Sequence, residues 1–203
     1  RAHLHDASCW VGTLVSPSRF TTAGSRWSKK LLVLVSSAAI AATISTVAMA
    51  IARGKRLVCY DGSGVGAAKL AFVLTLMGYD DVAVYDGVHG NPTAAQANAG
   101  GAAFRAHAAD CVVGLGGGAA LDVAKIVGVL GTHDGDALEF AWDHPSVRAI
   151  GDDLPYFVAL PTTAGTGSEV GRSAVISEDD THVKRIVFSP RILARAVFAD
   201  AEL

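Results

Sequence analysis

Three consecutive glycines, Gly116-Gly117-Gly118, are the part of the sequence best suited to bind a phosphate group. They stand between an apolar run at 111–115 and a helical pattern at 119–130. Glycines here leave backbone N–H groups unshielded, and the N-terminus of the following helix attracts an anion. We therefore expect this turn to hold a pyrophosphate. Asp122 is expected in the first turn of the helix, where a negative charge suits the helix dipole; simple helix stabilisation is the alternative role for this residue.

A second stretch is rich in hydroxyl groups and directly follows another predicted strand. It reads Pro161-Thr162-Thr163-Ala164-Gly165-Thr166-Gly167-Ser168-Glu169. Its hydroxyls can donate and accept hydrogen bonds, which suits phosphate and ribose oxygens.

A third candidate is the glycine-rich stretch at 62–66, which has the spacing G-x-G-x-G. Asp86 ends the next predicted strand, near where a ribose-binding acid is expected in a dinucleotide-binding fold. A βα turn without a ligand explains this stretch equally well.

These motifs need a scaffold in which strands and helices alternate. Apolar runs predict strands at 56–60, 82–85, 111–115 and 156–160, and helical patterns predict helices at 67–77, 93–107 and 119–130. Strands that are apolar throughout are typical of a parallel sheet covered on both faces. The sequence thus predicts an α/β fold, with a Rossmann-like parallel sheet flanked by helices.

Composition excludes several other classes of protein. The 203 residues are 51% hydrophobic and 18% charged with a net charge of -2, which excludes a disordered tail and a general binder of polyanions. No basic stripe with interleaved aromatic residues is present, so we expect no nucleic-acid partner. The 3 cysteines have no CxxC spacing and the 7 histidines no H-x-x-x-H spacing, so the sequence predicts neither a disulfide framework nor a metal site. The histidines are expected at the surface.

The chain divides into an N-terminal segment at 1–52 and a dinucleotide-binding domain at 53–203. The segment is basic up to Lys30 and then uncharged at 31–52, a run long enough to cross a bilayer. A targeting or membrane role, a helix packed on the domain, and a segment foreign to the domain are the alternatives for this run. We expect a cytoplasmic protein, with membrane association through 31–52 as the less favoured alternative. Because the chain starts with Arg1, we also expect a fragment.

Two motifs carry a family resemblance. GGGAALDVAK at 116–125 and PTTAGTGSE at 161–169, with NPT upstream at 91–93, resemble the iron-containing (group III) alcohol dehydrogenases. The resemblance covers about 55–203 and falls within the family's N-terminal nucleotide-binding domain, which is similar to that of dehydroquinate synthase.

The resemblance implies a set of residues that contact NAD. It places the pyrophosphate at Gly116, Gly117 and Gly118, with Asp122 in the same motif, and the nicotinamide half at Thr162, Thr163 and Thr166. It also implies that Lys184 reaches the ribose and that Asn91 borders the cofactor. Asp61 resembles an aspartate that faces the adenosine ribose, which implies NAD rather than NADP.

The resemblance also implies the reaction, which is NAD-dependent oxidation of an alcohol to an aldehyde or ketone by hydride transfer. In the family, Fe(II) or Zn(II) is bound by one aspartate and three histidines of a C-terminal helical domain. We expect these ligands, and all catalytic residues, to lie outside this chain, which alone should be inactive. The intact enzyme is expected to be a homodimer that acts on small alcohols and aldehydes.

Departures from the family pattern leave alternatives open. Ala119 stands where the family usually has a serine, and the missing hydroxyl should weaken pyrophosphate binding by roughly 1 kcal/mol. The stretch at 55–87 also resembles the end of a rhodanese domain, with Asp61 in the place of the catalytic cysteine. The alternatives are a relative of the hydroxyacid-oxoacid transhydrogenase type and a non-catalytic rhodanese-like or nucleotide-binding module.

Overall fold

A computed structural model of the chain describes residues 10–11, 56–60, 74–75, 78–79 and 81–200. Within these residues, a parallel sheet has the strand order β1-β8-β5-β4-β2-β3. Its strands are β1 (Trp10–Val11), β2 (Leu57–Tyr60), β3 (Val82–Tyr85), β4 (Cys111–Gly116), β5 (Tyr156–Pro161) and β8 (Ala196–Val197). The α/β fold with a parallel sheet is confirmed.

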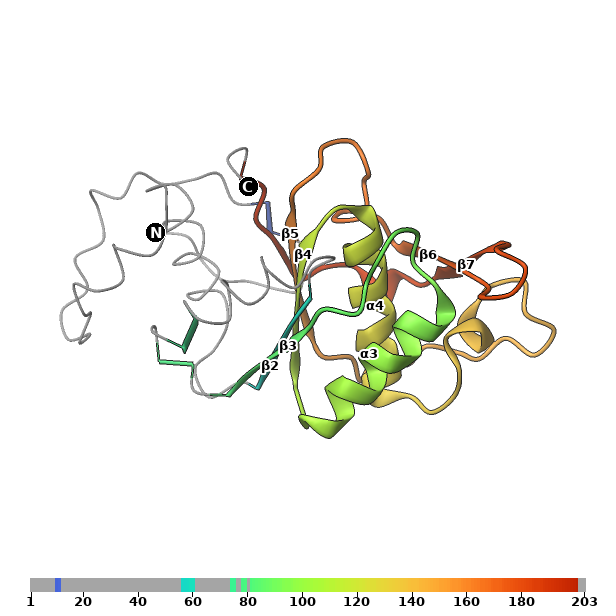
Figure 1. Cartoon of the computed structure of the whole chain (residues 1–203), viewed down its shortest axis with the longest axis horizontal. Helices are drawn as coiled ribbons and strands as arrows, with labels where there is room; N and C mark the ends of the chain where they lie inside the picture. Colours follow the sequence, from blue (N-terminus) through green and yellow to red (C-terminus); the bar gives the residue numbers. More distant parts are fainter. Residues whose placement is uncertain (1–9, 12–55, 61–73, 76–77, 80, 201–203) are drawn as a thin grey trace.

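Two described helices, α3 (Ala94–Ala106) and α4 (Gly118–Thr132), lie side by side on one face of this sheet (Figure 1). An antiparallel hairpin of β6 (Ser173–Ser177) and β7 (Lys184–Phe188) packs against α4 on the side away from the sheet (Figure 1). Short 3-10 helices, η3 (Ala137–Phe140) and η4 (Pro190–Ile192), lie in the connections. Helix α4 is therefore enclosed between the sheet and the hairpin.

The strand order places a topological switch point between β2 and β4. β3 lies on one side of β2, whereas β4, β5 and β8 follow one another on its other side. Because the strands are parallel, their carboxyl ends meet at one edge of the sheet. Ligands of open α/β sheets bind outside this edge at the switch point. The glycine turn after β4 lies at that position.

Close packing fixes α4 against β4. Residues 120–130 of α4 are all buried, as expected of a helix in which all but Asp122 and Lys125 of these residues are apolar or glycine. Gly114 of β4 lets the helix approach, since a Cβ on Gly114 would lie 3.0 Å from the Cβ of Ala124. This contact fixes the position of α4 along β4, and with it the position of the helix N-terminus relative to the end of the strand.

Several predictions for the N-terminal third lie outside the described residues. These are the role of 1–52, of which only Trp10–Val11 in β1 is described, the glycine-rich stretch at 62–66, the residue Asp61 and most of the helix expected at 67–77. In the part of the chain that the structure does describe, no helix has the length and apolar character needed to span a membrane. One predicted position is wrong: α4 begins at Gly118 rather than Ala119, and Asp122 therefore falls in its second turn instead of its first.

Candidate nucleotide-binding site

The glycine turn presents the N-terminus of α4 at the carboxyl edge of the sheet. Gly116 ends β4 with φ of 141°, a backbone conformation that favours glycine. Gly117 is the N-cap of α4 and makes no side-chain capping bond. The N–H groups of a first helical turn have no partner within the helix, and they carry the positive end of the helix dipole. The turn thus offers backbone donors to an anion.

The hydroxyl-rich loop begins beside this turn. Gly116 and Pro161 are paired across β4 and β5, and the N–H of Thr162 donates to the carbonyl oxygen of Gly116 over 3.0 Å. The side chain of Thr163 lies over Gly117, because a Cβ on Gly117 would be 3.2 Å from its Oγ1. The glycine turn and the threonines predicted with it are therefore brought together by strand pairing.

The tip of the loop folds back over the first residue of α4. Gly165 and Gly167 have φ of 89° and 70°, and these conformations reverse the chain. A Cβ on Gly118 would lie 3.2 Å from the Cβ of Thr166 and 3.2 Å from the Oγ of Ser168. The side chains of Thr162, Thr163 and Thr166 are exposed, so their hydroxyls are accessible at this edge.

Asp122 contacts the hairpin of β6 and β7, whereas its position in the motif suggested a place beside the glycine turn. Its residue is 8% exposed, and its Oδ2 accepts a hydrogen bond from the N–H of Val175 on β6 over 3.0 Å. Its Oδ1 lies 3.7 Å from the Nζ of Lys125, one turn further along α4. Asp122 therefore joins α4 to the hairpin.

Lys125 is a residue of this site that the sequence interpretation missed. Its side chain is fully buried, and its Nζ donates to the carbonyl oxygens of Gly171, over 3.1 Å, and Ser173, over 2.6 Å. These carbonyls stand where the hydroxyl-rich loop ends and β6 begins. The signal that could have identified it is a lysine three positions after an aspartate in an otherwise apolar helix.

Burial and mutual attraction oppose each other in this ion pair. Desolvation raises the pKa of Asp122, while the hydrogen bond from Val175 and the charge of Lys125 lower it. Desolvation lowers the pKa of Lys125, and the charges of Asp122 and Glu169 raise it. Desolvation is the larger effect on both groups, so the pKa of Asp122 is raised and that of Lys125 is lowered, and the attraction between the two charges makes both shifts smaller.

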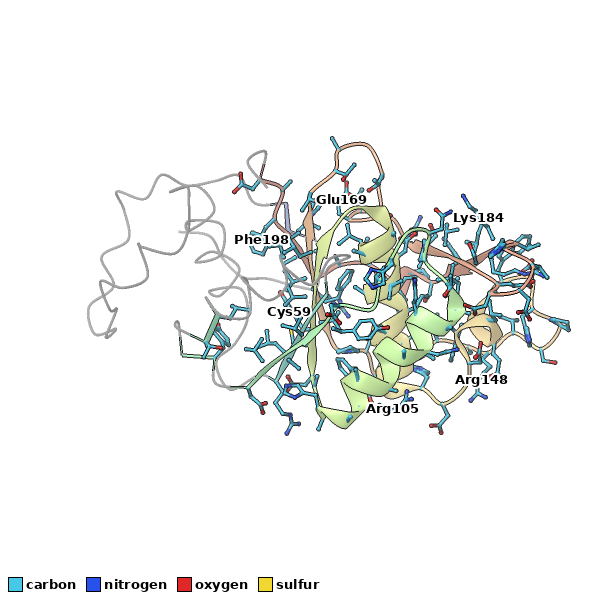
Figure 2. All side chains as sticks on the ribbon, viewed as in Figure 1. Cys59, Arg105, Arg148, Glu169, Lys184 and Phe198 are labelled. Atoms are coloured by element: carbon cyan, nitrogen blue, oxygen red, sulfur yellow. The ribbon has the colours of Figure 1, made fainter. Side chains whose placement is uncertain are left out.

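The backbone next to Asn91 and the backbone of Lys184 both lie beside Ser177 of the hairpin. Lys184 is the first residue of β7 and pairs with Ser177 of β6. The N–H of Ser177 donates to the carbonyl oxygen of Pro92 over 2.8 Å, and Ser177 forms a β-bridge with Thr93. Figure 2 shows Lys184 on the hairpin and Glu169 beside the start of α4. The predicted residues thus form two groups, one at the turn and one at the hairpin.

The described residues contain nothing that would fit the family's metal. Across 81–200 and the shorter described segments, no three His, Cys, Asp or Glu side chains form a group able to hold a metal ion. The histidines were expected at the surface, but His133 is partly buried. Its Nε2 accepts a hydrogen bond from the N–H of Gly151 over 2.8 Å. That contact ties the end of α4 to the loop before β5.

Comparisons with known proteins agree on one family. Residues 29–201 match the model of the family described as iron-containing alcohol dehydrogenase. The 1,3-propanediol dehydrogenase of Klebsiella pneumoniae is 39% identical over 113 residues, which cover 56% of this chain and 28% of that protein. The NAD-dependent methanol dehydrogenase of Bacillus methanolicus is 32% identical over 123 residues, 61% of this chain and 31% of that protein.

A solved structure agrees as well. The alcohol dehydrogenase from Oenococcus oeni superimposes with a TM-score of 0.63 at 31% identity, over 78% of this chain and 42% of that one. The matched part of the chain therefore spans less than half the length of each of these relatives.

Proposed function

The chain belongs to the iron-containing alcohol dehydrogenase family, and on this premise we propose that it is the NAD-binding part of an enzyme that oxidises alcohols. The observation that carries the proposal is the arrangement of Gly117 and Gly118, at the N-terminus of α4, beneath the hydroxyls of the loop at 162–168. The arrangement lies at the switch point of a parallel sheet, where such folds bind dinucleotides.

The residues of the turn fit a pyrophosphate. A side chain at Gly117 would fill the space between the turn and Thr163, so glycine keeps the backbone N–H groups open to a phosphate. Charge on the phosphates is stabilised by the dipole of α4 and by donated hydrogen bonds. Thr162, Thr163 and Thr166 then offer hydroxyls to the nicotinamide half of the cofactor.

We assign the remaining contacts to the two ribose groups. Lys184 and Asn91, which are both exposed, would lie along one ribose, and Asp61 would bind the hydroxyls of the adenosine ribose. A carboxylate there repels a 2'-phosphate, so NAD is preferred over NADP. The relative from Bacillus methanolicus, which is NAD-dependent, supports the same preference.

Bound NAD would supply the hydride acceptor, and the role of this chain is to bind and orient it. Among the described residues, no group of three His, Cys, Asp or Glu side chains could hold the metal that activates the alcohol in the family, so we assign to these residues cofactor binding alone. The relatives are named as dehydrogenases, which favours neither the transhydrogenase nor the rhodanese-like alternative. The homodimer and the cytoplasmic location stay predictions.

Calorimetric titration of the 203-residue chain with NAD, NADP and ADP tests the proposal. The informative variant is Gly117→Ala, whose Cβ would lie in the phosphate site. The matched control is Gly128→Ala on the same helix, where a Cβ would meet Pro155 at an ordinary 3.5 Å. We expect saturable binding of NAD, weaker binding of NADP, and a loss of about tenfold or more for Gly117→Ala alone.

Two outcomes would overturn the proposal. One is a folded wild-type chain, judged by a cooperative thermal transition, that binds neither NAD nor ADP. The other is Gly117→Ala binding NAD as tightly as Gly128→Ala does.

A further inference from the structure

We propose that Asp122 and Lys125 are positioning residues, which hold the hydroxyl-rich loop over the glycine turn and so control the affinity for the nicotinamide half of the cofactor. This inference rests on the function proposed above. It assigns to the pair no contact with the cofactor. Instead, the pair acts through the loop that carries the threonine hydroxyls.

The loop has two anchored ends and an exposed middle. Its first end is fixed by the sheet, through the pairing of Gly116 with Pro161 and the hydrogen bond from Thr162. Between the ends, the residues 162–166 are exposed. At its second end the loop leads into β6 through residues 171–175, which lie on the far side of α4 from the sheet. The side chains of Asp122 and Lys125 form hydrogen bonds with the backbone there.

At the second end of the loop, Asp122 and Lys125 form hydrogen bonds with backbone atoms. These bonds therefore do not depend on the loop's own side chains. Lys125 donates to two carbonyl oxygens, those of Gly171 and Ser173, and Asp122 accepts the N–H of Val175. All three bonds start from the second and third turns of the helix whose first turn forms the phosphate site. The pair therefore couples the position of the loop to the position of the glycine turn.

The neighbouring contacts extend this coupling toward the loop tip. Ser168 interacts with the carboxylate of Asp122, and Glu169, whose charge acts on Lys125, accepts a hydrogen bond from the Oγ1 of Thr166 over 3.4 Å. Thr166 in turn packs over Gly118. A chain of contacts thus runs from the buried pair to a hydroxyl assigned to the nicotinamide half.

The pair is more than a source of stability. A buried ion pair contributes little net stability compared with apolar residues of the same size, since desolvating both charges is costly. A hydrophobic pair could pack α4 equally well but could not bind the carbonyls of Gly171 and Ser173. The charged pair can therefore fix the loop backbone in a way that an apolar pair cannot.

The test compares two ligands that share the pyrophosphate but differ at the nicotinamide end. NAD and ADP are titrated into the full chain and into the double variant Asp122→Asn/Lys125→Met. The double variant leaves no unpaired buried charge and keeps an oxygen for the N–H of Val175, so it should fold. We expect its NAD affinity to fall about tenfold, because the loop is no longer ordered before binding, while its ADP affinity changes less than about twofold.

A matched control is Arg105→Met. Arg105 also donates from a cationic side chain to a carbonyl of α4, that of Leu130, but at the opposite end of the helix pair from Glu169 (Figure 2). It should lower stability without changing the ratio of NAD to ADP affinity.

The outcomes separate this inference from the function on which it rests. Equal losses of NAD and ADP affinity in the double variant, or the same change of ratio in Arg105→Met, would overturn the positioning role. If the wild-type chain binds neither ligand, the proposed function itself fails. The single variant Lys125→Met should be much less stable than the double variant, because it leaves Asp122 buried without its partner.

Discussion

Gly131 of α4 lies against the ring of Phe104 on α3 so closely that a Cβ on Gly131 would be 2.5 Å from the ring carbon Cδ1. The same two helices meet at Gly101, where a Cβ would be 2.6 Å from the Cβ of Leu130. These two glycines let α3 and α4 pack at short range. The position of α4, and with it the phosphate site, depends on this contact.

Gly131→Ala should therefore destabilise the protein. The added methyl group overlaps the ring of Phe104, and such overpacking typically costs about 1–3 kcal/mol. Urea denaturation followed by circular dichroism measures the free energy of unfolding. The control Gly128→Ala has room for its methyl group and should be neutral or up to about 1 kcal/mol more stable. Equal effects of the two substitutions would contradict the packing argument.

Ala119→Ser should strengthen NAD binding. Ala119 is the second residue of α4, next to the N–H groups assigned to the pyrophosphate, and a hydroxyl there adds one donor. We expect a gain of about 1 kcal/mol, which is roughly fivefold in affinity. Ala95→Ser is a suitable control, since Ala95 is the second residue of α3 and its N–H already donates to Asp179. A gain in both variants, or in neither, would count against a phosphate at Ala119.

Thr93→Ala should destabilise α3 and the segment that carries Asn91. Thr93 and Gln96 form a reciprocal capping box, with the Thr93 Oγ1 accepting the N–H of Gln96 over 3.3 Å and the Gln96 Oε1 accepting the N–H of Thr93 over 3.2 Å. Loss of such a cap costs about 1 kcal/mol. Thr93→Ser keeps the hydroxyl and should retain most of the stability in the same urea titration. If Thr93→Ser is as unstable as Thr93→Ala, the cap is not the cause.

The thiol of Cys59 should make stability fall at high pH. Complete burial raises its pKa from 9.0 to about 12, so above pH 9 an unfolded chain releases this proton while the folded chain keeps it. The unfolded state then binds fewer protons, and the free energy of unfolding decreases as the pH rises, by about 1.4 kcal/mol in total between pH 8 and pH 10 from this group. Unfolding free energies at pH 8, 9 and 10 would show the decrease. In Cys59→Ala the decrease should be smaller by that amount, and an unchanged slope would refute the assignment.

Much of the scaffold could be predicted from sequence because its signals are local. Apolar runs marked the four strands β2, β3, β4 and β5, whose observed bounds agree with the predicted ones to within a residue. Glycine at 116–118 marked the turn, since a backbone φ of 141° at Gly116 favours a residue without a Cβ. Such preferences depend on neighbouring residues in the chain, and they can be recognised without knowing the fold.

The roles of Asp122 and Lys125 could not be predicted in this way. Local rules placed Asp122 at the helix dipole, and they gave Lys125 no role. Their actual partners at 171–175 are 46 to 53 positions away along the chain, and these hydrogen bonds form only once β6 packs on α4. The same holds for Asn91 and Lys184, which are far apart in the sequence and which the hairpin brings to nearby backbone positions.

The α/β alternation, the glycine turn and the hydroxyl-rich stretch can thus be recognised without the structure, because each depends on the conformational preferences of a few consecutive residues. Which of these segments face one another depends instead on the folded chain as a whole. Strand order and the packing of β6 on α4 set the loop over the turn and directed the buried Asp122 and Lys125 to its backbone. Contacts between distant segments form only when the whole domain folds, and no local pattern in the chain specifies them.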